Sequence, residues 1–172
     1  MTTEEITETV KEQIVCSPSG LSAVFVALND NWGVKLYACQ DKRDETYEMQ
    51  MRCAAVGLGP QVGVKLELLE PPEPKSPEEE MSGEDFDCTY DYDGNLRKYF
   101  HYHIYGYTTE IVETVCHNVI NSWKWYIDNK LHCDLIIKTL ERECDFYFSD
   151  CHGMNWGRLK NGQLVPIDFG ED

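Results

Sequence analysis

The sequence has no long hydrophobic run and no Cys-x-x-Cys pair, and each absence excludes a class of protein. Without an apolar stretch of about 20 residues, no segment is predicted to cross a membrane as a helix. The acidic N-terminus predicts no signal peptide. The eight cysteines lie in ordinary strand and helix patterns, so we expect reduced thiols and a cytoplasmic protein. Their spacing relative to the histidines matches no standard zinc finger.

Basic residues are also scarce, because 15 lysines and arginines stand against 31 aspartates and glutamates, giving a formal net charge of −16. Such a surface repels the phosphate backbone, which excludes a simple nucleic-acid binder and favours a basic protein partner, if there is one. Between Glu67 and Asp93, eleven acidic residues and four prolines accompany a single lysine. This composition predicts an extended acidic insertion at about residues 70–94, which either is simply solvated or docks a basic partner.

What the sequence does contain fits one globular domain, since 172 residues with 42% hydrophobic and 27% charged side chains can bury a sizeable core. Lys35 alternates with Val34 and Leu36, so its side chain is expected on the opposite face of its strand from theirs. The next segment, 41–56, is predicted to be a helix that carries Glu45 and Glu48. Its expected apolar stripe consists of Tyr47, Met51, Ala54 and Leu58.

Two further segments have clear patterns. Residues 97–109 are rich in aromatic side chains and are predicted to be a strand. The region that follows, up to Cys144, is predicted to be helical because apolar residues recur at intervals of three and four. We expect these residues to be core, and they are Ile120, Trp123, Ile127, Leu131, Leu135, Ile136 and Leu140.

The stretch from Ser149 to Asp172 contains the strongest candidate for a site. Asp150, Asn155 and Asp168 flank two short alternating runs that are joined by an Asn-Gly turn. Asn-Gly is the best short hairpin signal, because both residues tolerate positive φ. The hairpin is therefore expected to bring Asp168 beside Asn155. Three oxygen-bearing side chains would then converge, which is what a hard cation such as Mg²⁺ requires.

This spacing, D-x-x-x-x-N followed by D-F-G, resembles the catalytic and metal loops of the protein kinases. With His152 included, the pattern D-x-H-x-x-N is more similar to the aminoglycoside-phosphotransferase branch of the kinase-like fold. The resemblance implies that Asp150 is a catalytic base or orients the substrate. It also implies that Asn155 and Asp168 bind the metal ion on the phosphates of a nucleotide.

The resemblance extends to the N-terminal half of the chain. The strand Gly33–Tyr37 resembles the kinase V-A-I-K strand, which implies that Lys35 contacts the α- and β-phosphates. The phosphate-covering loop would lie at 17–22, with Ser19 and Gly20 facing the phosphates, although serines replace its usual glycines.

Two more roles follow from the resemblance. Glu48, or else Glu45, would hold Lys35, and Glu48 is preferred because it lies deeper in the helix. Backbone groups near Glu110 and Val112 would bind adenine at the hinge.

The fold expected from the resemblance is α+β, a minimal kinase-like domain over residues 1–172. Its N-lobe, at about 8–110, would have an antiparallel sheet and one helix, interrupted by the acidic insertion. The helical C-lobe, at about 113–172, would be strongly reduced. Two residues follow Gly170, so we expect no activation segment and no A-P-E motif.

The implied function is an ATP- and Mg²⁺-dependent phosphotransferase that acts on a hydroxyl of a protein or a small molecule. The alternative is a pseudokinase, a binding module that engages a basic partner through its acidic surface. So compact a kinase suits a viral or effector protein, which would act in the host cytoplasm.

Overall fold

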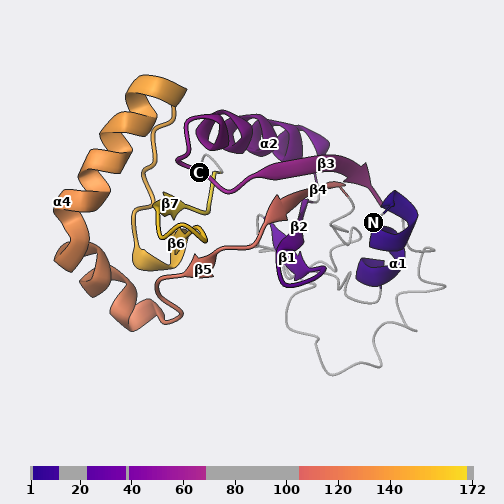
Figure 1. Cartoon of the computed structure of the whole chain (residues 1–172), viewed down its shortest axis with the longest axis horizontal. Helices are drawn as coiled ribbons and strands as arrows, with labels where there is room; N and C mark the ends of the chain where they lie inside the picture. Colours follow the sequence, from indigo (N-terminus) through magenta and orange to yellow (C-terminus); the bar gives the residue numbers. More distant parts are fainter. Residues whose placement is uncertain (1, 12–22, 38, 69–104, 170–172) are drawn as a thin grey trace, which may run out of the picture.

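A four-stranded antiparallel sheet forms the first half of the computed structural model, which describes residues 2–11, 23–37, 39–68 and 105–169 (Figure 1). Its strand order is β1-β2-β4-β3. The first two strands form a hairpin whose turn is fixed by Asn29, because its side chain accepts hydrogen bonds from the backbone N–H groups of Asn31 and Trp32. The four strands are Val24–Ala27 (β1), Trp32–Tyr37 (β2), Val62–Glu67 (β3) and Tyr105–Glu110 (β4).

Helix α1, Thr3–Lys11, covers one face of this sheet. Its buried residues Ile6 and Val10 pack with the side chains that alternate onto that face, namely Val26, Val34, Leu36, Leu66 and Leu68. Lys35 lies between Val34 and Leu36 and therefore belongs to the other face, as the alternation predicted. The expected position of Lys35 on its strand is confirmed.

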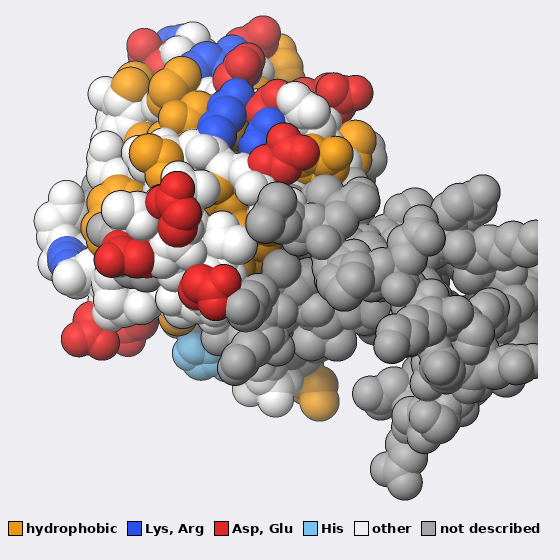
Figure 2. Space-filling model, turned by 90° about the vertical axis from the view of Figure 1, so that its right-hand side faces the viewer, with side chains coloured by type: hydrophobic (Ala, Val, Ile, Leu, Met, Phe, Trp, Pro, Cys, Tyr) orange, Lys and Arg blue, Asp and Glu red, His pale blue; other side chains and the backbone are white. Residues whose placement is uncertain are grey.

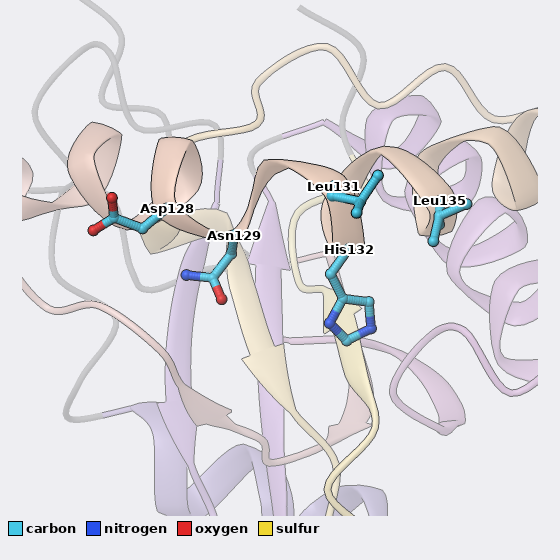
Figure 3. Close-up of a pocket in the computed structure, with 5 residues that line it drawn as sticks. All are labelled: Asp128, Asn129, Leu131, His132 and Leu135. Atoms are coloured by element: carbon cyan, nitrogen blue, oxygen red, sulfur yellow. The ribbon is translucent and has the colours of Figure 1, made fainter.

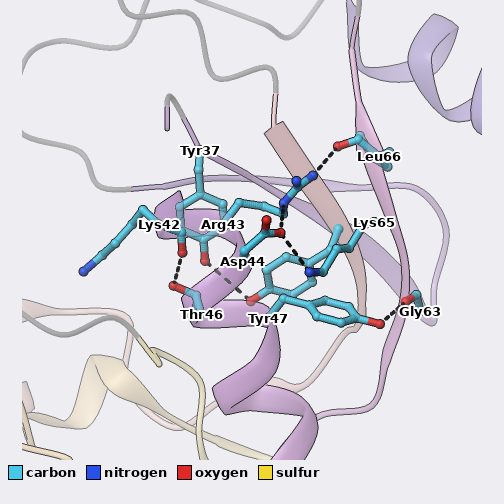
Figure 4. A network of polar contacts seen from close by, with 10 residues as sticks. Tyr37, Lys42, Arg43, Asp44, Thr46, Tyr47, Gly63, Lys65 and Leu66 are labelled. Atoms are coloured by element: carbon cyan, nitrogen blue, oxygen red, sulfur yellow. Dashed lines mark hydrogen bonds and ion pairs between the residues drawn. The ribbon is translucent and has the colours of Figure 1, made fainter. Parts of the chain in front are cut away.

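Helix α2, Gln40–Ala55, lies over the face that carries Lys35, and polar contacts fix it there (Figure 4). Arg43 donates to the carbonyl oxygen of Leu66 at 3.1 Å, and the hydroxyl of Tyr47 donates to that of Gly63 at 3.1 Å. The predicted apolar stripe is wrong at Met51, which is exposed, whereas Ala54 is buried as predicted. The buried side chains are Arg43, Thr46, Met49, Gln50, Cys53 and Ala54.

A second, three-stranded antiparallel sheet follows, with the order β5-β6-β7. Its strands are Glu113–Thr114, Trp156–Arg158 and Leu164–Pro166. The last two pair with each other, and Gly162 in their connection has a φ of 85°, as an Asn-Gly turn requires. The hairpin predicted after Asn155 is confirmed.

Helix α4, Val119–Cys144, begins at Asn118, whose side chain accepts from the N–H of Ile120, and ends at Asp145 with a left-handed backbone. One face packs into the second core of the molecule, with buried side chains at Cys133, Ile136, Leu140 and Cys144. The rest of this core consists of aromatic residues from the segments that follow, together with Leu164 and with Met49 and Cys53 of α2. The aromatic residues are Phe146, Phe148, Trp156 and Phe169.

The prediction that the whole apolar series of α4 is core is wrong. Ile136 and Leu140 are buried, but five of the seven residues are exposed, with exposed fractions between 54% at Trp123 and 86% at Ile120. The helix is apolar on two faces, so its periodicity could not show which face meets the core. The exposed five are Ile120, Trp123, Ile127, Leu131 and Leu135.

The expected α+β class is confirmed, since helices accompany two antiparallel sheets. The serine-rich loop with Ser19 and Gly20 and the acidic insertion at about 70–94 lie outside the described residues. Within the described ranges, no helix is both long and apolar enough to cross a membrane.

Candidate functional site

The loop that carries Asp150 is held against α4 and the second sheet. The backbone N–H of Met154 donates to the hydroxyl of Ser122 at 3.1 Å, and the indole of Trp156 donates to the carbonyl oxygen of Cys151 at 3.1 Å. A Cβ atom at Gly153 would lie 3.0 Å from the carbonyl oxygen of Ser122, so a larger residue would require this neighbour to shift. The loop is thus held by α4 at Met154 and by β6 at Cys151.

Asp150 and Asn155 are in direct contact within this loop. The amide nitrogen of Asn155 donates to the backbone carbonyl oxygen of Asp150 at 3.1 Å and to its Oδ2 at 2.9 Å. The Nε2 atom of His152 lies 3.3 Å from the same Oδ2. The carboxylate of Asp150 is therefore oriented by two neighbours, while its side chain remains 45% exposed.

Asp168 is brought to this pair by the hairpin. The backbone N–H of Ile167 donates to the carbonyl oxygen of Asn155 at 2.9 Å, which places the next residue, Asp168, at the same end of the sheet. Phe169 beyond it is buried and stacks on Phe146, with ring centroids 5.5 Å apart. The D-F-G segment is anchored on one side by a backbone bond and on the other by its aromatic side chain.

Lys35 reaches this segment from the first sheet, across 132 positions of sequence. Its Nζ donates to the carbonyl oxygen of Ile167 at 2.5 Å and lies 5.7 Å from the centre of the Phe169 ring. Burial lowers the pKa of Lys35 below its ordinary value of 10.5, and the negative charge of Asp168 partly opposes this. A series of hydrogen bonds thus connects Lys35 to Ile167, Ile167 to Asn155 and Asn155 to Asp150, with Asp168 next to Ile167 in sequence.

Two tyrosines that sequence reasoning did not single out also belong to this site. Burial raises the pKa of Tyr37 to about 12, and the charge of Asp168 adds to the rise. Burial likewise raises the pKa of Tyr107, with a smaller contribution from Asp168. Tyr37 lies two positions after Lys35 on β2 and Tyr107 is the β4 partner of Lys35, so strand alternation was the available clue.

The expected pairing of Glu48 with Lys35 is not formed. Glu48 and Glu45 are both exposed on α2. The buried position is occupied by Gln50, which accepts from the hydroxyl of Tyr107 at 2.9 Å and donates to Thr109 at 2.6 Å. A neutral amide therefore connects α2 to β4 where a carboxylate was expected.

The predicted hinge residues lie between the two sheets. Glu110 ends β4, and its backbone N–H already donates to the carbonyl oxygen of Gln61 at 2.8 Å. Val112 follows and packs on Gly157, where a side chain would come within 2.6 Å of the Val112 methyl carbon and 2.9 Å of that of Ile167. Val112 and Gly157 thus pack beside Ile167, the residue whose carbonyl oxygen accepts from Lys35.

The donor atoms at the site suit a hard cation. The amide nitrogen of Asn155 is used in its bonds to Asp150, so its Oδ1 is the Asn155 atom that could bind a metal, and the carboxylate of Asp168 is the second potential ligand. Among the residues that the structure describes, no group of three or more His, Cys, Asp or Glu is arranged to hold a metal ion. Mg²⁺ fits such a sparse set, because it usually keeps water and phosphate oxygens as its other ligands.

Two hollows on the described surface are shallow, and Lys35 lines neither of them. One is on α4, and the other is lined by Glu113, Thr114, Val115, Trp125 and Arg158.

No family model, no curated protein and no solved structure matches this chain. The structure itself shows the α+β class of the fold, with two antiparallel sheets.

Proposed function

We propose that this protein is a kinase-like phosphotransferase that uses ATP and Mg²⁺ to phosphorylate a hydroxyl of a protein or a small molecule. One observation carries the proposal. A lysine from the first sheet is bonded to the residue just before Asp168, and the same segment is bonded to Asn155, which in turn holds Asp150. These hydrogen bonds link a cation, two potential metal ligands and a candidate base, although 132 positions separate Lys35 from Ile167.

Each residue has a distinct part in this proposal. Lys35 would contact the phosphates, and Asn155 and Asp168 would hold Mg²⁺, which supplies charge neutralisation at the transferred group. The acceptor oxygen forms a bond to the γ-phosphorus while the bond from that phosphorus to the β–γ bridging oxygen breaks. Asp150 accepts the proton of the acceptor hydroxyl. Its Oδ1 makes no hydrogen bond among the described residues, whereas its Oδ2 is held by Asn155 and approached by His152.

Nucleotide binding requires a local exchange at Lys35. Its ammonium now donates to a neutral carbonyl oxygen, that of Ile167. A phosphate oxygen is a stronger acceptor, because a hydrogen bond between two charged groups is shorter and roughly twice as strong. Burial disfavours the charged form of Lys35, and the charge of Asp168 only partly offsets this, so a phosphate group would add a favourable interaction at the ammonium.

A specific observation favours a second candidate, a pseudokinase that binds a basic partner. Acidic side chains are spread over the described part of the face shown in Figure 2, with basic ones gathered near its upper margin. On α1, Glu4, Glu5 and Glu8 are all exposed. With a net charge of −16, this surface would steer a basic protein toward the molecule.

Phosphate transfer distinguishes the two candidates. Asp150→Asn is expected to lower incorporation of radiolabelled γ-phosphate by about 10² to 10⁴ while leaving the affinity for Mg-ATP nearly unchanged. The assay uses a cell extract as the source of acceptors. Asp30→Asn, an exposed aspartate in the turn between β1 and β2, is the matched control and should transfer at the native rate.

Equal transfer by the native protein and Asp150→Asn would show that Asp150 is not the base. Nucleotide binding without any transfer, together with retained binding of a basic partner, would favour the pseudokinase.

A further inference from the structure

Helix α4 lies at the edge of the molecule (Figure 1), and an apolar stripe is exposed along its residues 120–135. Its members have exposed fractions of 86, 54, 66, 78 and 59%, and they are Ile120, Trp123, Ile127, Leu131 and Leu135. Figure 3 shows Leu131 and Leu135 projecting next to each other from successive turns. A stripe of this length on a helix whose other face is already in the core indicates an interaction surface.

The spacing of the stripe is that of a helix-packing ridge. Trp123, Ile127, Leu131 and Leu135 follow one another at intervals of four residues, and rows of this kind pack into the grooves of a second helix. Beside the ridge is a shallow hollow lined by Asp128, Asn129, Leu131, His132 and Leu135 (Figure 3). A ridge next to a hollow can receive a copy of itself.

The residues around Asn129 form a self-complementary pattern. Two positions to either side stand Ile127 and Leu131, and six positions to either side stand Trp123 and Leu135. Apolar residues thus occupy equivalent places on both halves of the ridge. When an identical helix runs antiparallel across a two-fold axis at Asn129, each apolar side chain lies opposite an apolar side chain.

The charges invert across the same centre. Asp128 and Lys130 lie one position to either side of Asn129, and Lys124 and Asp134 lie five positions to either side. Within one helix they form the ion pairs Lys124–Asp128 at 2.9 Å and Lys130–Asp134 at 3.0 Å. Because residues two positions apart lie on opposite sides of a helix, each flank of the ridge carries one of these ion pairs and has no net charge, so a second copy meets no flank of a single sign.

The overall charge of α4 also favours a copy of the chain. The chain carries −16, but the helix is neutral, since its four basic residues balance its four acidic ones: Lys124, Lys130, Lys138 and Arg142 against Asp128, Asp134, Glu141 and Glu143. Two copies therefore repel each other least along this helix. A basic partner would find no excess negative charge here.

We propose that the α4 stripe is a homodimer interface, in which two copies pack antiparallel about a two-fold axis near Asn129. The leucines of each ridge enter the hollow of the other copy, and the four ion-pairing residues close the sides. This inference does not depend on the proposed phosphotransfer, and either can fail without the other.

Sedimentation of the full chain tests the interface. The native protein, at about 100 µM, is expected to sediment as a dimer of the 19.9-kDa chain. Leu131→Glu should weaken the dimer at least about tenfold, because it places a charge in the centre of the contact. The fold should survive, since Leu131 is 78% exposed. Met51→Glu, at an exposed apolar position on α2, is the matched control and should dimerise as the native chain does.

Exchange of the charged residues beside the ridge tests whether these residues lie in the interface. Lys124→Glu with Lys130→Glu makes the four charges acidic, and Asp128→Lys with Asp134→Lys makes them basic. Each double variant alone should be monomeric, and an equimolar mixture should form a heterodimer. A monomeric native protein at this concentration, a dimer unaffected by Leu131→Glu, or a mixture that stays monomeric would overturn the proposal. A monomeric native protein would indicate that the stripe binds a different protein chain.

Discussion

At the scale of single residues, the sequence was sufficient to predict contacts between residues that are close together along the chain. Asp150, Asn155 and Asp168 are connected by one loop and one hairpin, so turn chemistry alone predicted that they meet. The approach of Lys35 to Ile167 spans the two sheets, and no periodicity reveals it. The kinase resemblance implied that Lys35 and Asp168 serve the phosphates of one nucleotide, but it did not predict the contact with Ile167. The partner of Lys35 was predicted wrongly, because the helix phase that decides between Glu48 and Gln50 depends on tertiary packing.

The buried charge of Lys35 predicts a conflict between stability and function. Lys35→Met is expected to raise the free energy of unfolding of the apoprotein by about 1 kcal/mol at neutral pH, because it removes a desolvated charge. The same change should abolish nucleotide binding. Since the pKa of Lys35 is lowered in the folded state, the unfolded chain binds the extra proton. The rise in the free energy of unfolding should therefore be full below the pKa of Lys35 in the folded protein and shrink as the pH rises toward 10.5.

Urea denaturation of the native protein and of the variant across this pH range measures the effect. Lys65→Met is the matched control on the same sheet. Lys65 is half-exposed and pairs with Asp44 at 2.8 Å, so its loss should lower the free energy of unfolding by no more than about 1 kcal/mol. A large loss of stability in Lys35→Met would mean that its bond to Ile167 holds the fold together.

At the scale of elements, the patterns predicted what forms but not which face is covered. The Asn-Gly turn fixed the second hairpin through local chemistry. On α4, apolar residues lie on two faces, and on α2 the buried face includes Arg43, Thr46 and Gln50. Buried polar side chains that are satisfied by specific partners leave no apolar periodicity, so the face of α2 could not be read from hydrophobicity.

Substitutions of Gln50 and Glu48 on α2 are expected to change the free energy of unfolding by very different amounts. Gln50→Leu should lower the free energy of unfolding by about 2 kcal/mol, because it leaves the Tyr107 hydroxyl and the Pro60 carbonyl oxygen buried without their partner. Glu48→Gln, at an exposed position, should change it by less than about 0.5 kcal/mol and leave phosphate transfer intact. Chemical denaturation and the transfer assay measure both. Loss of transfer in Glu48→Gln alone would show that α2 rotates to engage Lys35.

At the scale of the whole molecule, the sequence predicted an α+β chain and an insertion between two strands. The insertion itself lies outside the described residues, but Glu67 at the end of β3 is paired with Tyr105 at the start of β4. The chain therefore leaves and re-enters the sheet at one place. The packing of α1 over the first sheet was not predicted, because that segment offered only Ile6 and Val10 as apolar residues.

The most direct test of the site that joins the two sheets is the melting temperature of the native protein with ATP, with and without Mg²⁺. At a hundred times its dissociation constant, a ligand adds roughly 2.7 kcal/mol of stability, which corresponds to several degrees for a chain of this size. The site predicts this rise only when both ATP and Mg²⁺ are present, and predicts its loss in Asp168→Asn. An unchanged melting temperature of the native protein across millimolar Mg-ATP would contradict nucleotide binding at Lys35 and Asp168.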